Sequence, residues 1–184
     1  MKLSDERRSR LLGLIFFMAY LSCSYAQIHI AYTTNLNGNL QPCQCQENEL
    51  GSMVRLATAV DSLRQIFPDL ILIDSGDFLK SYPVPVANKL MADFMRMMNY
   101  TVIGVGDQEF VEGDRFFEKT LYGNSLPMVS ANIKFTQSDT IKLPQYRIFE
   151  QNNIKIGITS VLHPQAFDFI MARDIEILPI EKTL

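Results

Sequence analysis

Four short runs of apolar residues, each closed by polar residues, organise this chain. They lie at Ile28–Tyr32, Leu70–Ile73, Thr101–Val105 and Met128–Ala131. The run Leu70–Ile73 is unbroken, which is typical of a strand that is covered on both faces, as in parallel sheets, whereas Ile28–Tyr32 is of mixed apolar character. Between them, apolar residues recur at helical spacing over residues 51–66, 87–98 and 114–122. The pattern predicts an α/β fold with a mostly parallel sheet, flanking helices and right-handed crossovers.

The later part of the chain departs from that alternation. Tyr146–Phe149 and Lys155–Ser160 are separated by the turn formers of Glu150–Asn153, which predicts an antiparallel hairpin. Two prolines predict an irregular loop over residues 81–86. The last segment, residues 174–184, contains one further apolar run.

The first 26 residues have the parts of a secretory signal peptide. A basic stretch precedes the apolar segment Leu11–Leu21, and Ser24–Ala26 carries small residues at the positions that a signal peptidase reads. We predict cleavage after Ala26, export to the periplasm or the extracellular space, and a domain over residues 27–184. An uncleaved anchor and lipid attachment at Cys23 are the alternatives. The apolar segment is short for a bilayer span, so no stable membrane span is expected after cleavage.

Charge argues against one class of partner. The net charge is −3 and the isoelectric point is about 5.4. Proteins that bind nucleic acid carry basic patches, because the phosphate backbone dominates their affinity. We therefore expect no nucleic-acid partner.

Polar clusters follow three of the predicted strands. Asn35 and Asn37 follow the first strand, Asp74 and Asp77 end the second, and residues 107–109 follow the third with the sequence Asp-Gln-Glu. Carboxyl ends of parallel strands meet at one edge of a sheet, where ligands of open α/β folds bind. The three clusters are therefore expected to converge. For Asp74 and Asp77 the alternative is a purely local role, in an Asx turn and a cap.

Together these segments resemble the N-terminal half of the calcineurin-like metallophosphoesterases, in particular the secreted 5'-nucleotidase branch. The matching motifs are collinear and lie at Thr34–Gly38, Gly51–Thr58, Ile73–Asp77, Gly106–Phe110, Ser130–Asn132 and Lys155–Ile158. The resemblance implies the first half of a four-layer α-β-β-α sandwich. It also implies an exported phosphoric-ester hydrolase that acts on nucleotides or other small phosphorylated molecules.

The same resemblance implies a two-metal site, which this chain alters. Asp77 occupies the position of the metal-bridging Asp. Asn35 and Asn37 replace an Asp and a His, Asp107 replaces an Asn, and Gln108 replaces the His that steadies the phosphate. The remaining oxygen ligands suit one Mg or Ca better than two ions of Mn, Fe or Zn. We expect at most a weakly held divalent metal (Mg, Ca, Mn or Zn) and no turnover by this chain alone. The alternative function is a non-catalytic protein that binds a ligand or cation on the same fold.

A cysteine pair gives a third hypothesis. Cys43 and Cys45 lie in a Pro-Cys-x-Cys segment, which is similar to one in a divergent exported branch of the family. Two thiolates with Asp77 would form a softer metal site or a redox module. A labile disulfide or two free thiols without a ligand role is the alternative.

The length of the chain suggests a partner. The family's catalytic domain has two packed sheets and needs about twice 184 residues. One sheet alone leaves an apolar face uncovered, and large exposed apolar patches mark interaction sites. We expect that face to be covered by a missing C-terminal half or by a second copy in a homodimer.

Overall fold

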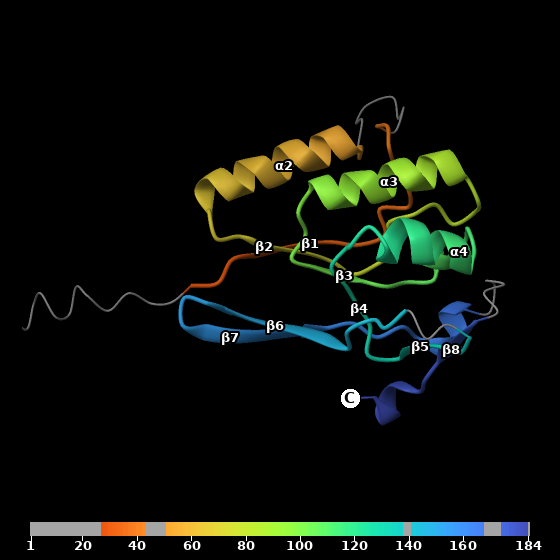
Figure 1. Ribbon diagram of the computed structural model, residues 1–184. Helices are drawn as coiled ribbons and strands as arrows, with labels where there is room; N and C mark the ends of the chain where they lie inside the picture. Colours follow the sequence, from red (N-terminus) through yellow and green to blue (C-terminus); the bar gives the residue numbers. More distant parts are fainter. Residues whose placement is uncertain (1–26, 43–50, 138–140, 168–173, 184) are drawn as a thin grey trace, which may run out of the picture.

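The computed structural model in Figure 1 describes residues 27–42, 51–137, 141–167 and 174–183. The predicted signal peptide, Cys23, Cys43 and Cys45 lie outside the described residues. Within the described part of the chain, no helix is long and apolar enough to span a membrane.

A four-stranded sheet forms the centre of the fold. Its order is β1-β2-β3-β4 and every neighbouring pair is parallel, with strands Ile30–Thr33, Ile71–Asp74, Val102–Gly104 and Met128–Val129. The predicted parallel sheet is confirmed. Strand β4 ends two residues before the predicted Ala131, because Ser130 N and Ala131 N bond outside the sheet, to Pro144 O and Ser160 O. In register, Thr33 pairs with Asp74, and Asp74 pairs with Ile103, so the first three strands end at the same edge.

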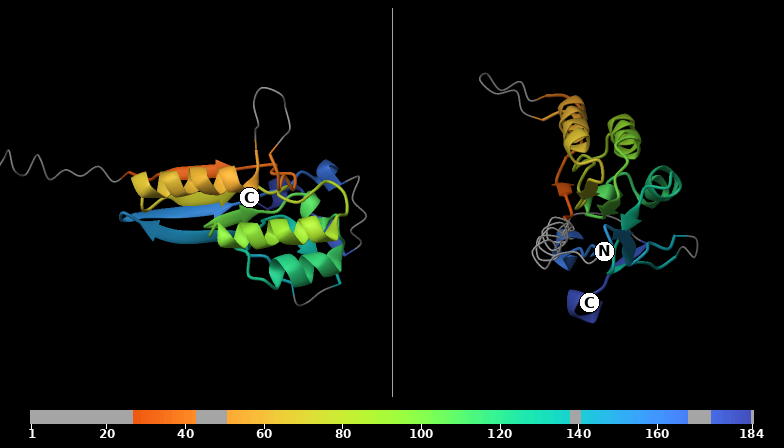
Figure 2. Two further views of the ribbon diagram at one scale, coloured as in Figure 1. Left: turned by 90° about the horizontal axis from the view of Figure 1, so that it is seen from above. Right: turned by 90° about the vertical axis from the view of Figure 1, so that its left-hand side faces the viewer.

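Three helices cover one face of this sheet (Figures 1 and 2). They are α2 (Met53–Ile66), α3 (Pro85–Met97) and α4 (Asp114–Phe116), and the last continues as the π-helix η2 (Phe117–Tyr122). Their apolar sides pack on the sheet and build the core, which includes Leu72, Met91, Met95, Ile103, Phe110 and Phe117.

The prediction of an irregular loop over residues 81–86 is wrong for its last two residues, which are helical. Helix α3 begins at Pro85, with Val84 as its N-cap residue. Proline is favoured at this first helical position because its ring presets φ and the missing N–H has no partner there in any helix. The second proline therefore starts the helix.

The predicted hairpin is confirmed and lies on the opposite face of the sheet (Figure 1). Strands β6 (Tyr146–Gln151) and β7 (Ile154–Thr159) pair antiparallel. Asn152 and Asn153 both have positive φ, 52° and 62°, which matches the tight turns that suit twisted hairpins. Gln151 Nε2 donates to Asp69 O at 2.7 Å, and so ties the hairpin to the turn that precedes β2.

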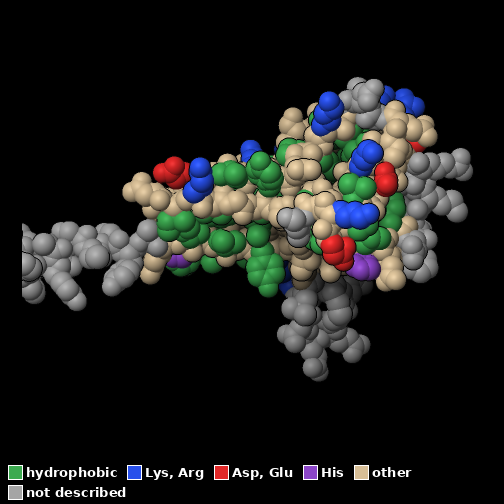
Figure 3. All heavy atoms as spheres, turned by 90° about the horizontal axis from the view of Figure 1, so that it is seen from below, with side chains coloured by type: hydrophobic (Ala, Val, Ile, Leu, Met, Phe, Trp, Pro, Cys, Tyr) green, Lys and Arg blue, Asp and Glu red, His purple; other side chains and the backbone are tan. Residues whose placement is uncertain are grey.

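The hairpin covers only part of this face. A cavity of about 280 Å³ remains between the sheet and β7, lined among others by Val102 and Ile158. On β1, Ile30 and Tyr32 are 51% and 73% exposed. Figure 3 shows hydrophobic side chains gathered on this side of the molecule. That a second half or a second copy covers the face stays a prediction.

A second short strand pair escaped the sequence analysis. Strand β5 (Ile133–Phe135) pairs antiparallel with β8 (Ile175–Ile177), although about forty residues separate them. The sequence shows an apolar run within residues 174–184, but no local signal pairs it with a segment about forty residues away. Three short 3-10 helices complete the elements of the described residues: η1 (Gln108–Phe110), η3 (Pro164–Phe167) and η4 (Ile180–Lys182).

Candidate functional site

The loops that follow β1 and β2 lie side by side at the carboxyl edge of the sheet. Asn35 N donates to Gly76 O at 3.2 Å, and Asn37 N donates to Asp77 O at 3.0 Å. These bonds extend the parallel pairing of β1 and β2 beyond the strands themselves. They bring the first two polar clusters together.

Three of these residues have left-handed backbone conformations. Their φ values are 49° for Asn35, 50° for Asn37 and 60° for Asp77. Asn and Asp adopt this region more readily than other non-glycine residues. Strained backbone conformations persist only where surrounding contacts hold them, and they cluster at functional sites.

Gln108 links the third cluster to the other two. Its Nε2 donates to Asn37 Oδ1 at 2.9 Å, and its backbone N donates to Asp77 Oδ1 at 3.2 Å. Its Oε1 is buried and accepts no hydrogen bond from the residues that the structure describes. The two amides that replace the family's histidines are therefore bonded to each other.

The carboxyl groups of Asp77 and Asp107 meet beside these amides. Burial, the negative charge of Asp77 and a hydrogen bond between the two side chains raise the pKa of Asp107 to about 6. Gly106 makes room for the pair, because a Cβ atom there would lie 2.1 Å from Asp77 Oδ1. A proton or a cation between the two groups would relieve their repulsion.

Asp74 takes no part in this cluster of polar side chains. Its Oδ1 accepts from Gly76 N at 2.8 Å, which is the Asx turn considered above, and its Oδ2 accepts from the Thr33 hydroxyl. The side chain is 3% exposed, and burial raises its pKa to about 6, against the opposing hydrogen bond from Thr33. Asp74 therefore shapes the loop that carries Asp77.

Sequence reasoning did not single out the role of Glu109. Its carboxylate is fully buried and accepts hydrogen bonds from Asp77 N, Phe78 N and Gly106 N. Burial raises its pKa to about 8, although the backbone hydrogen bond from Asp77 opposes the shift. The signals in the sequence were its place in a polar cluster after a strand and in the motif Gly106–Phe110.

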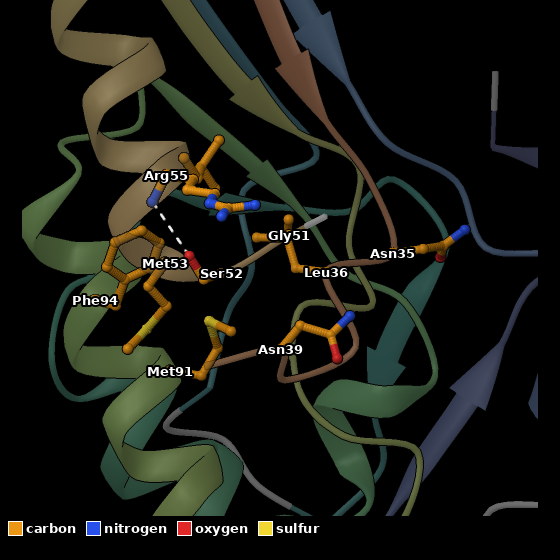
Figure 4. Close-up of a pocket in the computed structure, with 10 residues that line it drawn as sticks. Asn35, Leu36, Asn39, Gly51, Ser52, Met53, Arg55, Met91 and Phe94 are labelled. Carbon is orange, nitrogen blue, oxygen red and sulfur yellow. Dashed lines mark hydrogen bonds between the residues drawn. The ribbon is translucent and has the colours of Figure 1, made fainter. Parts of the chain in front are cut away.

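A cavity of about 340 Å³ opens beside Asn35, between the loop after β1 and helices α2 and α3 (Figure 4). Ser52 caps α2 by accepting from Arg55 N at 3.3 Å, and Met53 and Phe94 supply apolar walls. The Asn35 amide points away from the other lining side chains in this view. The cavity therefore adds an apolar recess next to the polar cleft.

The donor set at the cleft decides which metal it fits. Among the described residues, no three His, Cys, Asp or Glu side chains gather closely enough to hold a metal ion. Two carboxyl groups with neighbouring amide oxygens suit a single hard cation, whereas two closely spaced transition metals need more carboxylate and imidazole ligands. The described residues do not fit a two-metal centre.

Sequence comparison finds nucleotide phosphoesterases. No family model matches the chain. A 2',3'-cyclic-nucleotide 2'-phosphodiesterase/3'-nucleotidase of Yersinia enterocolitica is 25% identical over 86% of this chain and 28% of its own length. A 5'-nucleotidase of Homo sapiens is 25% identical over 72% of this chain and 25% of its own.

Solved structures agree in fold. A 5'-nucleotidase precursor from Thermus thermophilus matches 85% of this chain with a TM-score of 0.74 at 19% identity. The NAD nucleotidase of Haemophilus influenzae matches 85% with a TM-score of 0.73 at 18% identity. The fold is that of a 5'-nucleotidase-like metallophosphoesterase N-terminal domain.

These matches in sequence and fold confirm the resemblance to 5'-nucleotidases on which the fold prediction depended. The chain spans 32% and 30% of the two solved structures, so it matches only part of each. The curated relatives are nucleotide phosphoesterases, and the resemblance of this chain is to that class.

Proposed function

We propose that this 5'-nucleotidase-like chain is exported and that its cleft binds one divalent cation together with a small phosphorylated molecule, such as a nucleotide. The pairing of Asp77 with Asp107 carries the proposal, because the charge of one group makes ionisation of the other costly. A divalent cation offsets that repulsion better than a proton does at neutral pH. The curated relatives, which are nucleotide phosphoesterases, support the choice of ligand.

Each side chain has a distinct task in this proposal. Asp77 and Asp107 hold the cation, which would neutralise part of the phosphate charge. The amides of Asn37 and Gln108 give up their mutual hydrogen bond of 2.9 Å, and their N–H groups donate to phosphate oxygens. The buried Gln108 Oε1, which has no described donor, favours a rearrangement of that side chain on binding.

The same residues argue against hydrolysis by this part of the chain. An amide at Gln108 does not supply a proton at neutral pH, whereas a histidine does. Loss of one electrostatic donor costs roughly a hundredfold or more in rate, and Asn35, Asn37 and Gln108 change three such positions together. We infer a binding role, with hydrolysis at no more than background rate.

Mn²⁺ is the probe that tests cation binding, because its paramagnetism broadens the NMR signals of neighbouring nuclei. Addition of Mn²⁺ to the purified chain should broaden signals of residues 77 and 107 first. Asp77→Ala and Asp107→Ala should each weaken binding about tenfold or more. Asp93→Ala is the control, because Asp93 lies on α3 and pairs with Lys89 and Arg96. Binding that survives both cleft variants would refute the proposal.

Hydrolysis is tested separately with AMP, UDP-glucose and p-nitrophenyl phosphate in Mg²⁺, Mn²⁺, Ca²⁺ or Zn²⁺. We expect no turnover above background. Turnover that Asp77→Ala abolishes would show that the chain is an active phosphoesterase. Cys43→Ser and Cys45→Ser would then test whether those thiols supply the missing ligands.

A further inference from the structure

Glu109 joins the loop after β3 to the loop after β2 through a single buried carboxylate. Its Oε2 accepts from Asp77 N at 3.0 Å and from Gly106 N at 2.7 Å, while its Oε1 accepts from Phe78 N at 3.0 Å. The side chain is 0% exposed. Both oxygens are thus occupied by backbone N–H groups, so Glu109 has no oxygen directed into the cleft.

Asp77 needs support on both sides because its backbone is left-handed, with φ of 60°. On one side its carbonyl accepts from Asn37 N at 3.0 Å. On the other side its N–H donates to Glu109. With the backbone held from both directions, the carboxylate projects toward Gln108 N, which donates to it at 3.2 Å.

Close approach of the two loops explains why an acceptor for several backbone N–H groups is needed between them. A Cβ atom on Gly76 would lie 2.6 Å from Gly106 N, so the backbones nearly touch. A carboxyl group can accept several hydrogen bonds through its two oxygens. Without Glu109, the three N–H groups would lose their acceptor, which is costly.

We propose that Glu109 is a positioning residue, which holds the Asp77 backbone in its left-handed conformation and so directs the Asp77 carboxylate into the cleft. The value of that direction for cation binding rests on the proposed function. The hydrogen bonds themselves do not, and they can be measured without any metal.

Amide hydrogen exchange on the purified chain tests the proposal. Glu109→Gln keeps the size of the side chain but replaces one acceptor oxygen with an NH₂ donor. We expect the amides of Asp77, Phe78 and Gly106 to exchange about tenfold faster or more, since one of the two acceptor oxygens is lost. The Gln108 amide does not bond to Glu109. Its chemical shift should nevertheless move toward the value it takes in Asp77→Ala, as the carboxylate moves away.

Glu112→Gln is the matched control, because Glu112 Oε1 also accepts from backbone and side chain, at Val84 N and Asn88 Nδ2. This variant should leave the signals of Asp77 and Gln108 unchanged. Unchanged exchange of the three amides in Glu109→Gln would overturn the proposal. So would faster exchange throughout the chain with no movement of the Gln108 amide.

Two further measurements separate this proposal from others. In the unaltered chain, NMR measures scalar couplings across hydrogen bonds from the Glu109 carboxyl carbon to the three amide nitrogens. Absence of these couplings would contradict the proposal even if the Glu109→Gln variant does not fold. Mn²⁺ titration then distinguishes the positioning role of Glu109 from the proposed binding of a cation. If the unaltered chain binds no Mn²⁺, the proposed function fails while the exchange result still decides the role of Glu109. If it binds, Glu109→Gln should weaken binding about tenfold and Glu112→Gln should not.

Discussion

Gln108 Nε2 donates a 2.9 Å hydrogen bond to Asn37 Oδ1, although 71 residues separate the two in the chain. Both positions carry histidines in the family that the chain resembles. The Gln108 N–H group bonds to the Asn37 oxygen, whereas a neutral imidazole keeps a nitrogen lone pair that can bind a metal. The replacement therefore joins the position of a metal ligand to the position of a phosphate-steadying group in a direct hydrogen bond.

Restoring the family residues should reverse this change. Asn35→Asp, Asn37→His, Asp107→Asn and Gln108→His together should raise the affinity for Mn²⁺ or Zn²⁺ by tenfold or more, because imidazole and carboxylate suit these ions. Competition with a fluorescent chelator measures the affinity. The same four changes in an Asp77→Ala background should give no gain. Equal affinities of the restored and unaltered chains would contradict the assignment of these positions.

Gly106→Ala should disturb the cleft directly. The new Cβ atom would lie 2.1 Å from Asp77 Oδ1 and 3.0 Å from Asp77 N, so the carboxylate must move. We expect a loss of about 1–3 kcal/mol in the free energy of unfolding, as for other overpacked sites. Cation affinity should fall with it. Gly157→Ala is the control, since its nearest neighbour would be 3.9 Å away and little change in urea denaturation is expected.

Stability should fall as the pH rises through the range in which Asp74 titrates. Burial raises the pKa of Asp74 from 3.8 to about 6. The folded chain therefore binds this proton more tightly than the unfolded chain, and that contribution is present below pH 3.8 and lost as the pH passes 6. Asp74→Asn should remove this contribution to the pH dependence of the free energy of unfolding. Its side chain still accepts from Gly76 N and should make the variant as stable as the unaltered chain, or more stable, at pH 7.5.

Urea denaturation between pH 4 and pH 7.5 measures this effect. The gain of Asp74→Asn at the upper end should reach at most about 3 kcal/mol, at roughly 1.4 kcal/mol for each unit of pKa shift. Asp93→Asn is a control of opposite sign, because hydrogen bonds from Lys89 and Arg96 lower the pKa of Asp93 on the surface. An unaltered slope in Asp74→Asn would show that other groups, Glu109 among them, carry the whole pH dependence.

Export should leave a defined N-terminus. Small residues precede Gln27, so the secreted product of the expressed chain should begin there. Intact mass spectrometry of the secreted material checks the position. Replacing Ala26 with a bulky residue should block processing at this site. A product that retains residues 1–26, or that carries a lipid on Cys23, would contradict the prediction.

Local pattern was enough to predict the order of the main elements. The apolar runs predicted the strands that became β1 to β4, and turn-forming residues predicted the hairpin of β6 and β7. These features depend on neighbouring residues and on the need to bury apolar side chains, so they can be recognised along the chain. The start of α3 at Pro85 was missed, because a proline that stops one helix is also well suited to begin another.

For the candidate site too, some features could be predicted from local sequence and others depend on tertiary packing. The sequence by itself determined that Asn35, Asn37, Asp77, Asp107 and Gln108 follow strands, and parallel order then brings them to one edge. Only the tertiary structure decided that Asp74 turns into the loop, that Gln108 bonds to Asn37, and that Glu109 holds three backbone N–H groups. Contacts of this kind depend on how closely separate loops approach and on which donors are left buried between them. No local pattern along the chain carries that information, because it arises when the loops pack.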